Sequence, residues 1–248
     1  MSICNNSYVT TTLQDRLDAI TENTRALVQP ERLALVDQVI AELFASGIEE
    51  RIVQPGAKLP AFALPDAANR IVRSEDLLAI GPLVIKFFRG RWCPYCITEL
   101  ETWRELYADL RAKGALLVAI SPQTIRQNDF AVQQHKFGFP ILRDENCTLA
   151  SQLGLTWSPP PYYRDYLRSI LVNIPFVNAN LTSRQTGYRP VYDRGAGAFE
   201  GPDHNEDAAW NMPLPATVVV RQDGTIAFAE AHADFRVRPE PADIFDAL

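Results

Sequence analysis

Residues 83–96 read LVIKFFRGRWCPYC. The apolar run over 83–88 predicts a buried strand, and the apolar residues after it recur at the spacing of one helix face. Those helix-face residues are Ile97, Leu100, Trp103, Leu106, Tyr107 and Leu110. Gly114 then ends the predicted helix. The stretch therefore places Cys93 and Cys96 between a buried strand and the first turn of a helix.

The Cys-x-x-Cys pair at this position has the features of a redox site. A cysteine at a helix N-terminus faces unpaired backbone N–H groups and the positive end of the helix dipole, which lowers its pKa. The thiolate formed in this way attacks disulfides and peroxides. Cys96 lies one turn beyond Cys93 and is placed to close a disulfide with it. We therefore expect Cys93 and Cys96 to be the catalytic residues.

A zinc site and a buried structural pair are the two alternatives for this motif. Structural zinc usually takes four ligands in two close pairs. The other candidate ligands are isolated in the sequence: Cys4, Cys147, His135, His204 and His232. We therefore expect no metal. The sequence also has no dinucleotide-binding glycine motif after a strand and no phosphate loop, so we expect no cofactor.

Length and composition are those of one large globular domain, or of one domain with an insertion. The net charge of −6 gives no sign of a nucleic-acid or anionic membrane surface. No apolar run approaches a membrane span, and residues 1–12 lack the pattern of a signal peptide. We therefore expect a cytoplasmic protein. In that reducing compartment a cysteine pair is more often catalytic than structural.

The chain divides into an N-terminal helical extension over 1–53 and a main domain over 54–248. In the extension, apolar residues recur at helical spacing between Leu13 and Leu27 and again after Pro30. The extension is either an appendage or a dimer contact, or it packs on its own domain.

The main domain is predicted to be α/β. Residues 83–120 read as strand, helix and strand, which implies a parallel pair of strands. Alternating strands over 216–220 and 225–230 flank a turn at Asp223-Gly224 and form a hairpin. A final helix starts near Pro241. This order predicts a thioredoxin-like fold, a central mixed sheet flanked by helices.

Residues 156–212 interrupt this rhythm with many prolines and aromatic residues. An unpatterned stretch of this length is usually a functional lid or a disordered insert. One helix is expected over Tyr162–Val172. The insertion ends just before Pro215, next to the expected redox site, so we expect its Tyr and Trp side chains to line an apolar entrance to the cysteines.

Several motifs together resemble the peroxiredoxin-like branch of the alkyl hydroperoxide reductase/thiol-specific antioxidant (AhpC/TSA) family, in the thioredoxin superfamily. In this branch a Cys-x-x-Cys replaces the usual single peroxidatic cysteine. The matching segments are FRGRWCPYC at 88–96, AISPQ at 119–123, FPILRD at 139–144, PLPAT at 213–217, Asp223-Gly224 and EPAD at 240–243. The resemblance implies an antioxidant enzyme that reduces hydroperoxides through a Cys93/Cys96 dithiol–disulfide cycle. It also implies an external thiol reductant, a thioredoxin-like protein or glutathione, and it leaves a homodimer open.

The chain departs from the typical family motif around the nucleophile. Arg89 stands at the position of the family proline and Cys93 at that of the family threonine, so only Cys96 matches the peroxidatic cysteine. Pro215 resembles the cis-proline of thioredoxins, so the insertion is expected to precede a cis-Pro strand.

Further residues are expected to support the site. Arg89 and Arg91 are candidate donors to the departing peroxide oxygen. Trp92 is expected to cover the pair from water. Pro94 and Tyr95, the residues between the cysteines, are also the pair found in glutaredoxins, which indicates glutathione as a reductant.

Two mechanisms remain open, and they exchange the roles of the cysteines. In a thioredoxin-type mechanism Cys93 attacks a disulfide and Cys96 resolves the mixed disulfide. In a peroxidase mechanism Cys96 attacks the peroxide and Cys93 condenses with the resulting sulfenic acid. The alternatives to a peroxidase are therefore a disulfide oxidoreductase and a non-catalytic, redox-sensing binding module.

Overall fold

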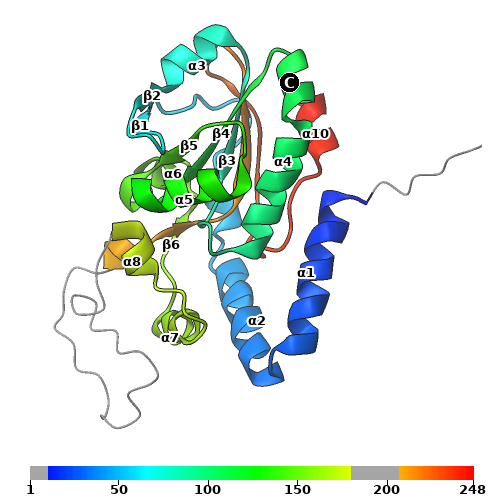
Figure 1. Cartoon of the computed structure of the whole chain (residues 1–248), viewed down its shortest axis with the longest axis vertical. Coiled ribbons are helices and arrows are strands. Elements are labelled where there is room, and N and C mark those ends of the chain that lie inside the picture. The colour runs from blue at the N-terminus through cyan, green and yellow to red at the C-terminus, as the bar shows by residue number, and fades with distance from the viewer. Residues whose placement is uncertain (1–10, 180–206) are drawn as a thin grey trace, which may run out of the picture.

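The computed structural model describes residues 11–179 and 207–248, and a central mixed sheet dominates these residues (Figure 1). Its strands are β3 (Leu83–Phe87), β4 (Leu116–Ser121), β5 (Ile141–Arg143), β8 (Ala216–Val220) and β9 (Ile226–Ala231). The five lie in the order β5-β4-β3-β8-β9. β3, β4 and β5 run parallel, whereas β8 is antiparallel to both β3 and β9. The predicted strand–helix–strand unit and the predicted hairpin are thus confirmed.

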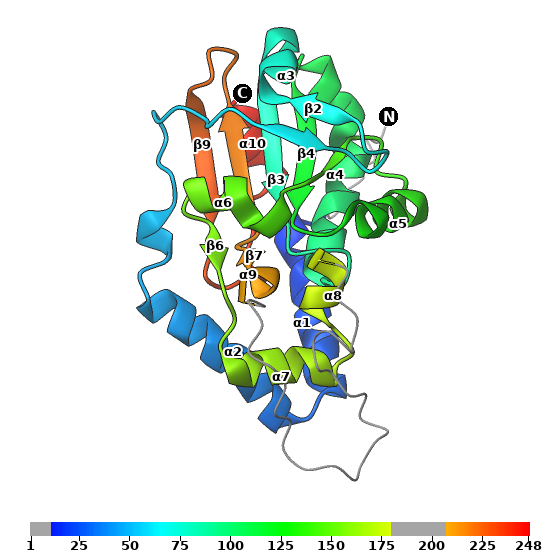
Figure 2. The same ribbon diagram turned by 90° about the vertical axis from the view of Figure 1, so that its left-hand side faces the viewer.

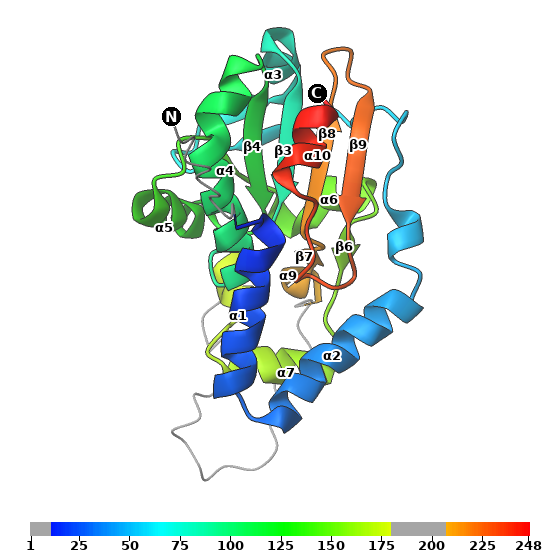
Figure 3. The same ribbon diagram turned by 90° about the vertical axis from the view of Figure 1, so that its right-hand side faces the viewer.

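Helices cover both faces of this sheet. One face carries α4 (Pro94–Ala112) and α10 (Pro241–Asp246), as Figure 3 shows. The other carries α6 (Thr148–Gln152) and the small pair of β1 (Ala63–Pro65) and β2 (Ile71–Arg73), visible in Figure 2. The connecting elements are α3 (Ser74–Ile80), α5 (Ile125–His135) and the short 3-10 helices η1 (Glu49–Arg51) and η2 (Glu145–Cys147). The thioredoxin-like fold class is therefore confirmed.

All five residues of β3 are buried, as expected for a central strand that is covered on both faces. Alternate side chains point to opposite faces of the sheet. Leu83, Ile85 and Phe87 pack in the core on the α6 side, whereas Val84 packs on the α4 side. The same alternation directs the charged side chain of Lys86 toward α4.

The two predicted N-terminal helices are confirmed as α1 (Leu13–Leu27) and α2 (Pro30–Ala45). They diverge below the sheet, at the end of β3 from which α4 departs (Figure 3). The start of α1 is anchored because the backbone N–H of Leu13 donates to Glu240 Oε2 at 3.0 Å. α2 buries Val39 and Leu43. The division of the chain at residues 53 and 54 stays a prediction.

The described part of the predicted insertion is folded. It begins and ends on an antiparallel pair, β6 (Thr156–Trp157) with β7 (Met212–Pro213), and the predicted helix is confirmed as α7 (Pro161–Ser169). Two short helices, α8 (Ile174–Ala179) and α9 (Asp207–Trp210), complete it. Trp157, Tyr163, Leu167 and Trp210 are buried and belong to the core on the α6 side.

The expectation of a cis peptide bond at Pro215 is wrong, since all peptide bonds within 11–179 and 207–248 are trans. Leu214 N donates to Leu155 O at 2.7 Å, and Ala216 is already paired with Phe87. The chain therefore passes from β7 into β8 without the tight turn that a cis bond usually serves. No helix in the described ranges combines the length and the apolar character of a membrane span.

Candidate active site

A tight loop leads from β3 to Cys93, the N-cap residue of α4. Gly90 has φ +147°, and a Cβ atom there would lie 2.6 Å from Trp92 Nε1, so only glycine fits. The backbone N–H of Cys93 donates to Gly90 O at 3.1 Å and closes the turn. Pro94 occupies the first helical position, where its fixed φ suits the helix start.

Cys93 carries the thiolate of the pair. Its side chain is 0% exposed, and Arg89 Nη2 donates to its Sγ at 3.3 Å. Burial raises the pKa of Cys93, but a hydrogen bond from Cys96 and the charge of Arg89 outweigh burial and hold this pKa well below its ordinary value. The helix N-terminus favours the same charge state.

Cys96 is held as a neutral thiol, although it lies only one helical turn away. Burial raises its pKa, and the hydrogen bond to Cys93 and the negative charge of Cys93 raise it further. The arginine nearest to this sulfur is a different one, Arg238, whose Nη2 lies 3.9 Å from Cys96 Sγ.

A buried ionic cluster lies beside Cys96. Glu99 Oε1 forms an ion pair with Lys86 Nζ at 2.5 Å, and Glu99 Oε2 accepts a hydrogen bond from Arg238 Nε at 2.8 Å. Burial raises the pKa of Glu99, but the two cations outweigh burial and lower it, so the side chain is a carboxylate. Three distant segments, β3, α4 and the loop before α10, supply the members of this cluster.

Arg89 faces aromatic side chains and retains unused donors. Its guanidinium lies 3.7 Å from the ring centroid of Phe235 and 4.9 Å from that of Trp92. Its Nε and Nη1 are buried and have no hydrogen-bond partner among the described residues. Burial raises the pKa of Tyr163, and the nearby positive charge of Arg89 opposes this rise. The site thus offers a thiolate, a fixed cation and donors that a ligand can take up.

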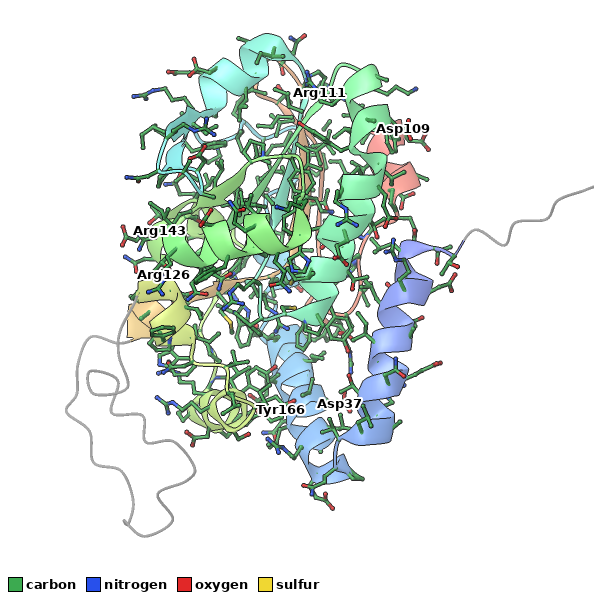
Figure 4. The ribbon with its side chains drawn as sticks, in the orientation of Figure 1. Asp37, Asp109, Arg111, Arg126, Arg143 and Tyr166 are labelled. Carbon is green, nitrogen blue, oxygen red and sulfur yellow. The ribbon has the colours of Figure 1, made fainter. Side chains whose placement is uncertain are left out.

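A cavity of about 270 Å³ adjoins this arginine and opens between α1, α2 and α7. Tyr166 of α7 and Asp37 of α2, both labelled in Figure 4, lie on its wall. Most of the remaining lining is apolar or aromatic, and it includes Val28, Leu33, Val36, Trp92, Pro94, Tyr95, Tyr163, Leu167, Ile170 and Phe235. The expected aromatic lining from the insertion is confirmed for Tyr163 and Tyr166, whereas Trp157, Tyr162 and Trp210 do not line the cavity. Tyr188 and Tyr192 lie outside the described residues.

The structure brings most of the predicted supporting residues to this cavity. Trp92, Pro94 and Tyr95 line it together with Arg89. Arg91 does not line the cavity, and its Nε donates to Gln127 Oε1 at 2.7 Å on α5. The expected role of Arg91 at the cysteines stays a prediction.

Sequence reasoning missed several residues of the site, chiefly Lys86, Phe235 and Arg238. A lysine inside the apolar run LVIKFF was a usable signal, because a charge in a buried strand needs a partner. No local pattern marks Arg238, which lies 142 residues beyond Cys96. The described residues contain no cluster of three or more His, Cys, Asp or Glu side chains that could hold a metal ion.

Comparison with known proteins agrees with this architecture. Residues 55–229 match the model of the AhpC/TSA family. A Mycobacterium tuberculosis protein named as a peroxiredoxin is 29% identical over 103 residues, which cover 42% of this chain and 67% of that protein. The thiol-disulfide oxidoreductase ResA of Bacillus anthracis is 26% identical over 117 residues, which cover 46% of this chain and 65% of ResA.

Two solved structures share the fold. Enterococcus faecalis AhpC superposes with a TM-score of 0.52 at 16% identity, covering 79% of this chain and 90% of that chain. Peroxidoxin BcpB from Mycobacterium tuberculosis superposes with a TM-score of 0.50 at 20% identity, covering 74% and 91% respectively. The chain therefore belongs to the AhpC/TSA family, and it is a thiol-dependent oxidoreductase with a thioredoxin-like fold.

Proposed function

We propose that the chain reduces hydroperoxides, with Cys93 as the attacking thiolate and Cys96 as the resolving thiol. The observation that carries this proposal is the contact of Arg89 with Cys93 Sγ at 3.3 Å, beside a cavity of about 270 Å³. Cys93 attacks one peroxide oxygen, the O–O bond breaks, and Cys93 becomes a sulfenic acid. The departing alkoxide takes a proton from solvent and leaves as an alcohol, or as water when the substrate is hydrogen peroxide.

Arg89 supplies what the cleavage of the O–O bond needs. Negative charge develops on the departing oxygen, and fixed donors in a site that excludes water stabilise such charge strongly. The Nε and Nη1 atoms of Arg89 are buried donors without a partner among residues 11–179 and 207–248. One side chain can therefore hold the thiolate and receive the departing oxygen.

This assignment exchanges the roles that the family motif implies. The family position of the peroxidatic cysteine corresponds to Cys96. The electrostatics favour Cys93, because Cys93 has the lowered pKa and Cys96 the raised one. Since only the thiolate is a strong nucleophile, Cys93 is the better candidate to attack the peroxide.

The burial of the pair favours a small substrate over a protein disulfide. Both sulfurs belong to residues that are 0% exposed, and the cavity beside them is of small-molecule size. Thiol–disulfide exchange requires the thiolate to reach a substrate sulfur directly, which a folded protein cannot do here without rearrangement. A hydroperoxide is small enough to occupy the cavity, whose wall includes Arg89, Trp92 and Pro94 beside Cys93.

The cycle closes with a disulfide between Cys93 and Cys96, which an external thiol then reduces. A thioredoxin-like protein or glutathione fits this role, and the buried site favours the smaller thiol. The cycle begins from two free thiols, so a reducing compartment such as the cytosol suits it.

Single-turnover kinetics of two cysteine variants test the proposal. Cys93→Ser should lose roughly 1,000-fold or more of the rate with hydroperoxide, as expected when a nucleophile is removed. Cys96→Ser should keep a burst of one equivalent and accumulate a sulfenic acid, which dimedone traps for mass spectrometry. Full reactivity in Cys93→Ser together with loss in Cys96→Ser would reverse the assignment.

The same experiment separates the alternative functions. A reduced wild-type protein that reacts only with a small disulfide would be a thioredoxin-type oxidoreductase. The lowered pKa of the first cysteine and the raised pKa of the second also suit that activity. A protein that reacts once with peroxide but does not turn over with any added thiol would instead be a redox-sensing module.

A further inference from the structure

The cluster of Lys86, Glu99 and Arg238 is unusual because charged side chains are seldom fully buried. Their exposed fractions are 0%, 1% and 4%. Two basic side chains, Lys86 and Arg238, face a single carboxylate, Glu99. A buried charge without a partner is strongly unfavourable, so these basic side chains would stabilise an anion that forms next to them.

Cys96 is the group that can become this anion. Arg238 uses Nε on Glu99 and Nη1 on the carbonyl oxygens of Phe235 and Val237, each at 2.6 Å. Its remaining nitrogen, Nη2, lies 3.9 Å from Cys96 Sγ. Lys86 contributes less directly, since its Nζ also donates to Thr217 Oγ1 on β8.

Oxidation of Cys93 changes the balance of charge around Cys96. In the reduced site, the negative charge on Cys93 and the hydrogen bond between the sulfurs hold Cys96 as a thiol. A sulfenic acid at Cys93 carries no such charge, whereas the positive charge of Arg238 remains. Cys96, next to Arg238, is then the cysteine whose thiolate is stabilised.

We propose that Arg238, held in place by Glu99 and Lys86, stabilises the Cys96 thiolate during the resolving step; this inference rests on the proposed peroxidase cycle. The Cys96 sulfur bonds to the Cys93 sulfur, and the S–OH bond of the sulfenic acid breaks. The hydroxide that leaves takes the proton that Cys96 has lost, and water forms. No further oxidant or reductant is needed. Arg238 contacts a reacting sulfur, while Glu99 and Lys86 are positioning residues.

Other charged groups also face this sulfur or its neighbours. Arg89 approaches from the loop before α4 and favours the Cys96 thiolate, as Arg238 does. Glu230 on β9 adds a negative charge that acts on Lys86. Arg89 is already engaged with Cys93 Sγ, so Arg238 is the guanidinium nearest to Cys96, and its charge also contributes to the lowered pKa of Cys93.

Two-phase single-turnover kinetics of Arg238→Met test this inference. Reduced protein is mixed with hydrogen peroxide, and sulfenic acid formation and disulfide formation are followed separately by dimedone competition and by tryptophan fluorescence, since Trp92 adjoins Cys93. We expect sulfenic acid formation to slow by at most about threefold, because Arg238 contributes only a lesser part of the lowered pKa of Cys93 and the Arg89 contact remains. Disulfide formation should slow roughly 10-fold or more, with its pH midpoint moved upward, because a charge-assisted contact is lost.

Two further variants make the outcome decisive. Arg238→Lys keeps the charge and should restore part of the rate of disulfide formation. Arg104 is an exposed arginine on the same helix as Cys96, and it donates to His135 O. The control variant Arg104→Met should leave both phases unchanged. If circular dichroism shows that Arg238→Met does not fold, the Lys variant and the wild-type pH profile carry the test.

Three results would overturn the inference. The first is disulfide formation at an unchanged rate in Arg238→Met and Arg238→Lys. The second is a wild-type resolving rate that rises through the pH range of an ordinary exposed thiol. The third is a first phase that slows as much as the second in the Arg238 variants, which would place this arginine in peroxide cleavage. Failure of the proposed function looks different, because the wild type would then show no sulfenic acid phase or Cys93→Ser would still react.

Discussion

The two cysteines of this protein lie one helical turn apart, yet each has its own arginine and a different environment. Arg89 contacts Cys93 at 3.3 Å and lines a cavity, and two of its nitrogens have no partner among the described residues. Arg238 lies 3.9 Å from Cys96 and is bound to a buried carboxylate. The cavity side of the pair therefore has donors that a substrate can use. The core side has a cation that acts on the Cys96 sulfur.

This difference explains how one motif produces two unlike thiols. Burial raises the pKa of both sulfurs, and the balance of hydrogen bond and charge then lowers that of Cys93 and raises that of Cys96. Because the hydrogen bond runs from Cys96 to Cys93, each protonation state supports the other. The pair should titrate as a unit rather than as two independent groups.

The largest effect is expected when the core side loses its carboxylate. Glu99→Gln leaves Lys86 and Arg238 as buried cations without an anion, and breaking such a cluster costs about 3–5 kcal/mol of unfolding free energy. Urea denaturation of the reduced protein measures this loss. Glu101→Gln is the matched control on the same helix, since Glu101 pairs with His135 and is 31% exposed, and it should cost less than about 1 kcal/mol.

Equal losses in the two glutamate variants would contradict this view of the core side. A small loss in Glu99→Gln alone would mean that Lys86 is neutral in the fold. Burial acts in that direction, because it lowers the pKa of Lys86 against the opposing charge of Glu99.

A smaller but sharper effect is expected on the cavity side. Arg89→Met removes the cation beside Cys93 and the donors for the departing oxygen, so the peroxide rate at neutral pH should fall about 100-fold. In the wild type the folded pKa of Cys93 is depressed, so the rate should be constant at neutral pH and fall as pH drops through that pKa. In the variant the midpoint should move to higher pH. Stopped-flow kinetics and the ultraviolet absorbance of the thiolate measure both changes.

The same depressed pKa links stability to pH. The contribution of the Cys93 thiolate to stability is fully present above the pKa of the unfolded thiol, and it is lost as pH falls through the folded pKa.

Arg91→Met is the control for Arg89→Met in the same loop. Because Arg91 binds Gln127, its substitution should change the peroxide rate by less than about threefold. Similar effects of the two substitutions would show that the loop, rather than the Arg89 contact, sets the reactivity.

The smallest effect is expected at the cavity wall. Tyr166→Ala removes an aromatic wall that stacks on Tyr163 with ring centroids 5.3 Å apart. The KM for cumene hydroperoxide should rise about 3- to 10-fold, while the rate with hydrogen peroxide should stay nearly constant. Tyr162→Ala is the control on the same helix, since Tyr162 donates to Glu42 Oε2 at 2.9 Å and does not line the cavity. Equal changes for both peroxides would argue against binding in this cavity.

The fold was largely predictable, because its main signals are local. The apolar run before Cys93, the helical spacing after it and the hairpin around Asp223-Gly224 each depend on neighbours within about one element. The trans bond at Pro215 was not predictable, since the path of the chain between β7 and β8 depends on pairing with distant strands.

The candidate site was only partly predictable for a related reason. Cys93, Cys96, Trp92 and Arg89 are adjacent in sequence, and one short loop brings them together. Two arginines of that loop, Arg89 and Arg91, could not be told apart by spacing. Packing decides between them, because one guanidinium lies over Phe235 from the far end of the chain and the other binds a glutamine of α5.

The sequence by itself determined that a Cys-x-x-Cys pair begins a helix after a buried strand, and therefore that one of its sulfurs is activated. Only the tertiary structure decided which sulfur is the thiolate and which charges surround each. Arg238 meets Cys96 across 142 residues of chain, and Lys86 reaches Glu99 only because β3 and α4 are packed face to face. A pKa depends on distances between charges and on burial, and neither quantity is encoded in the spacing of residues along the chain.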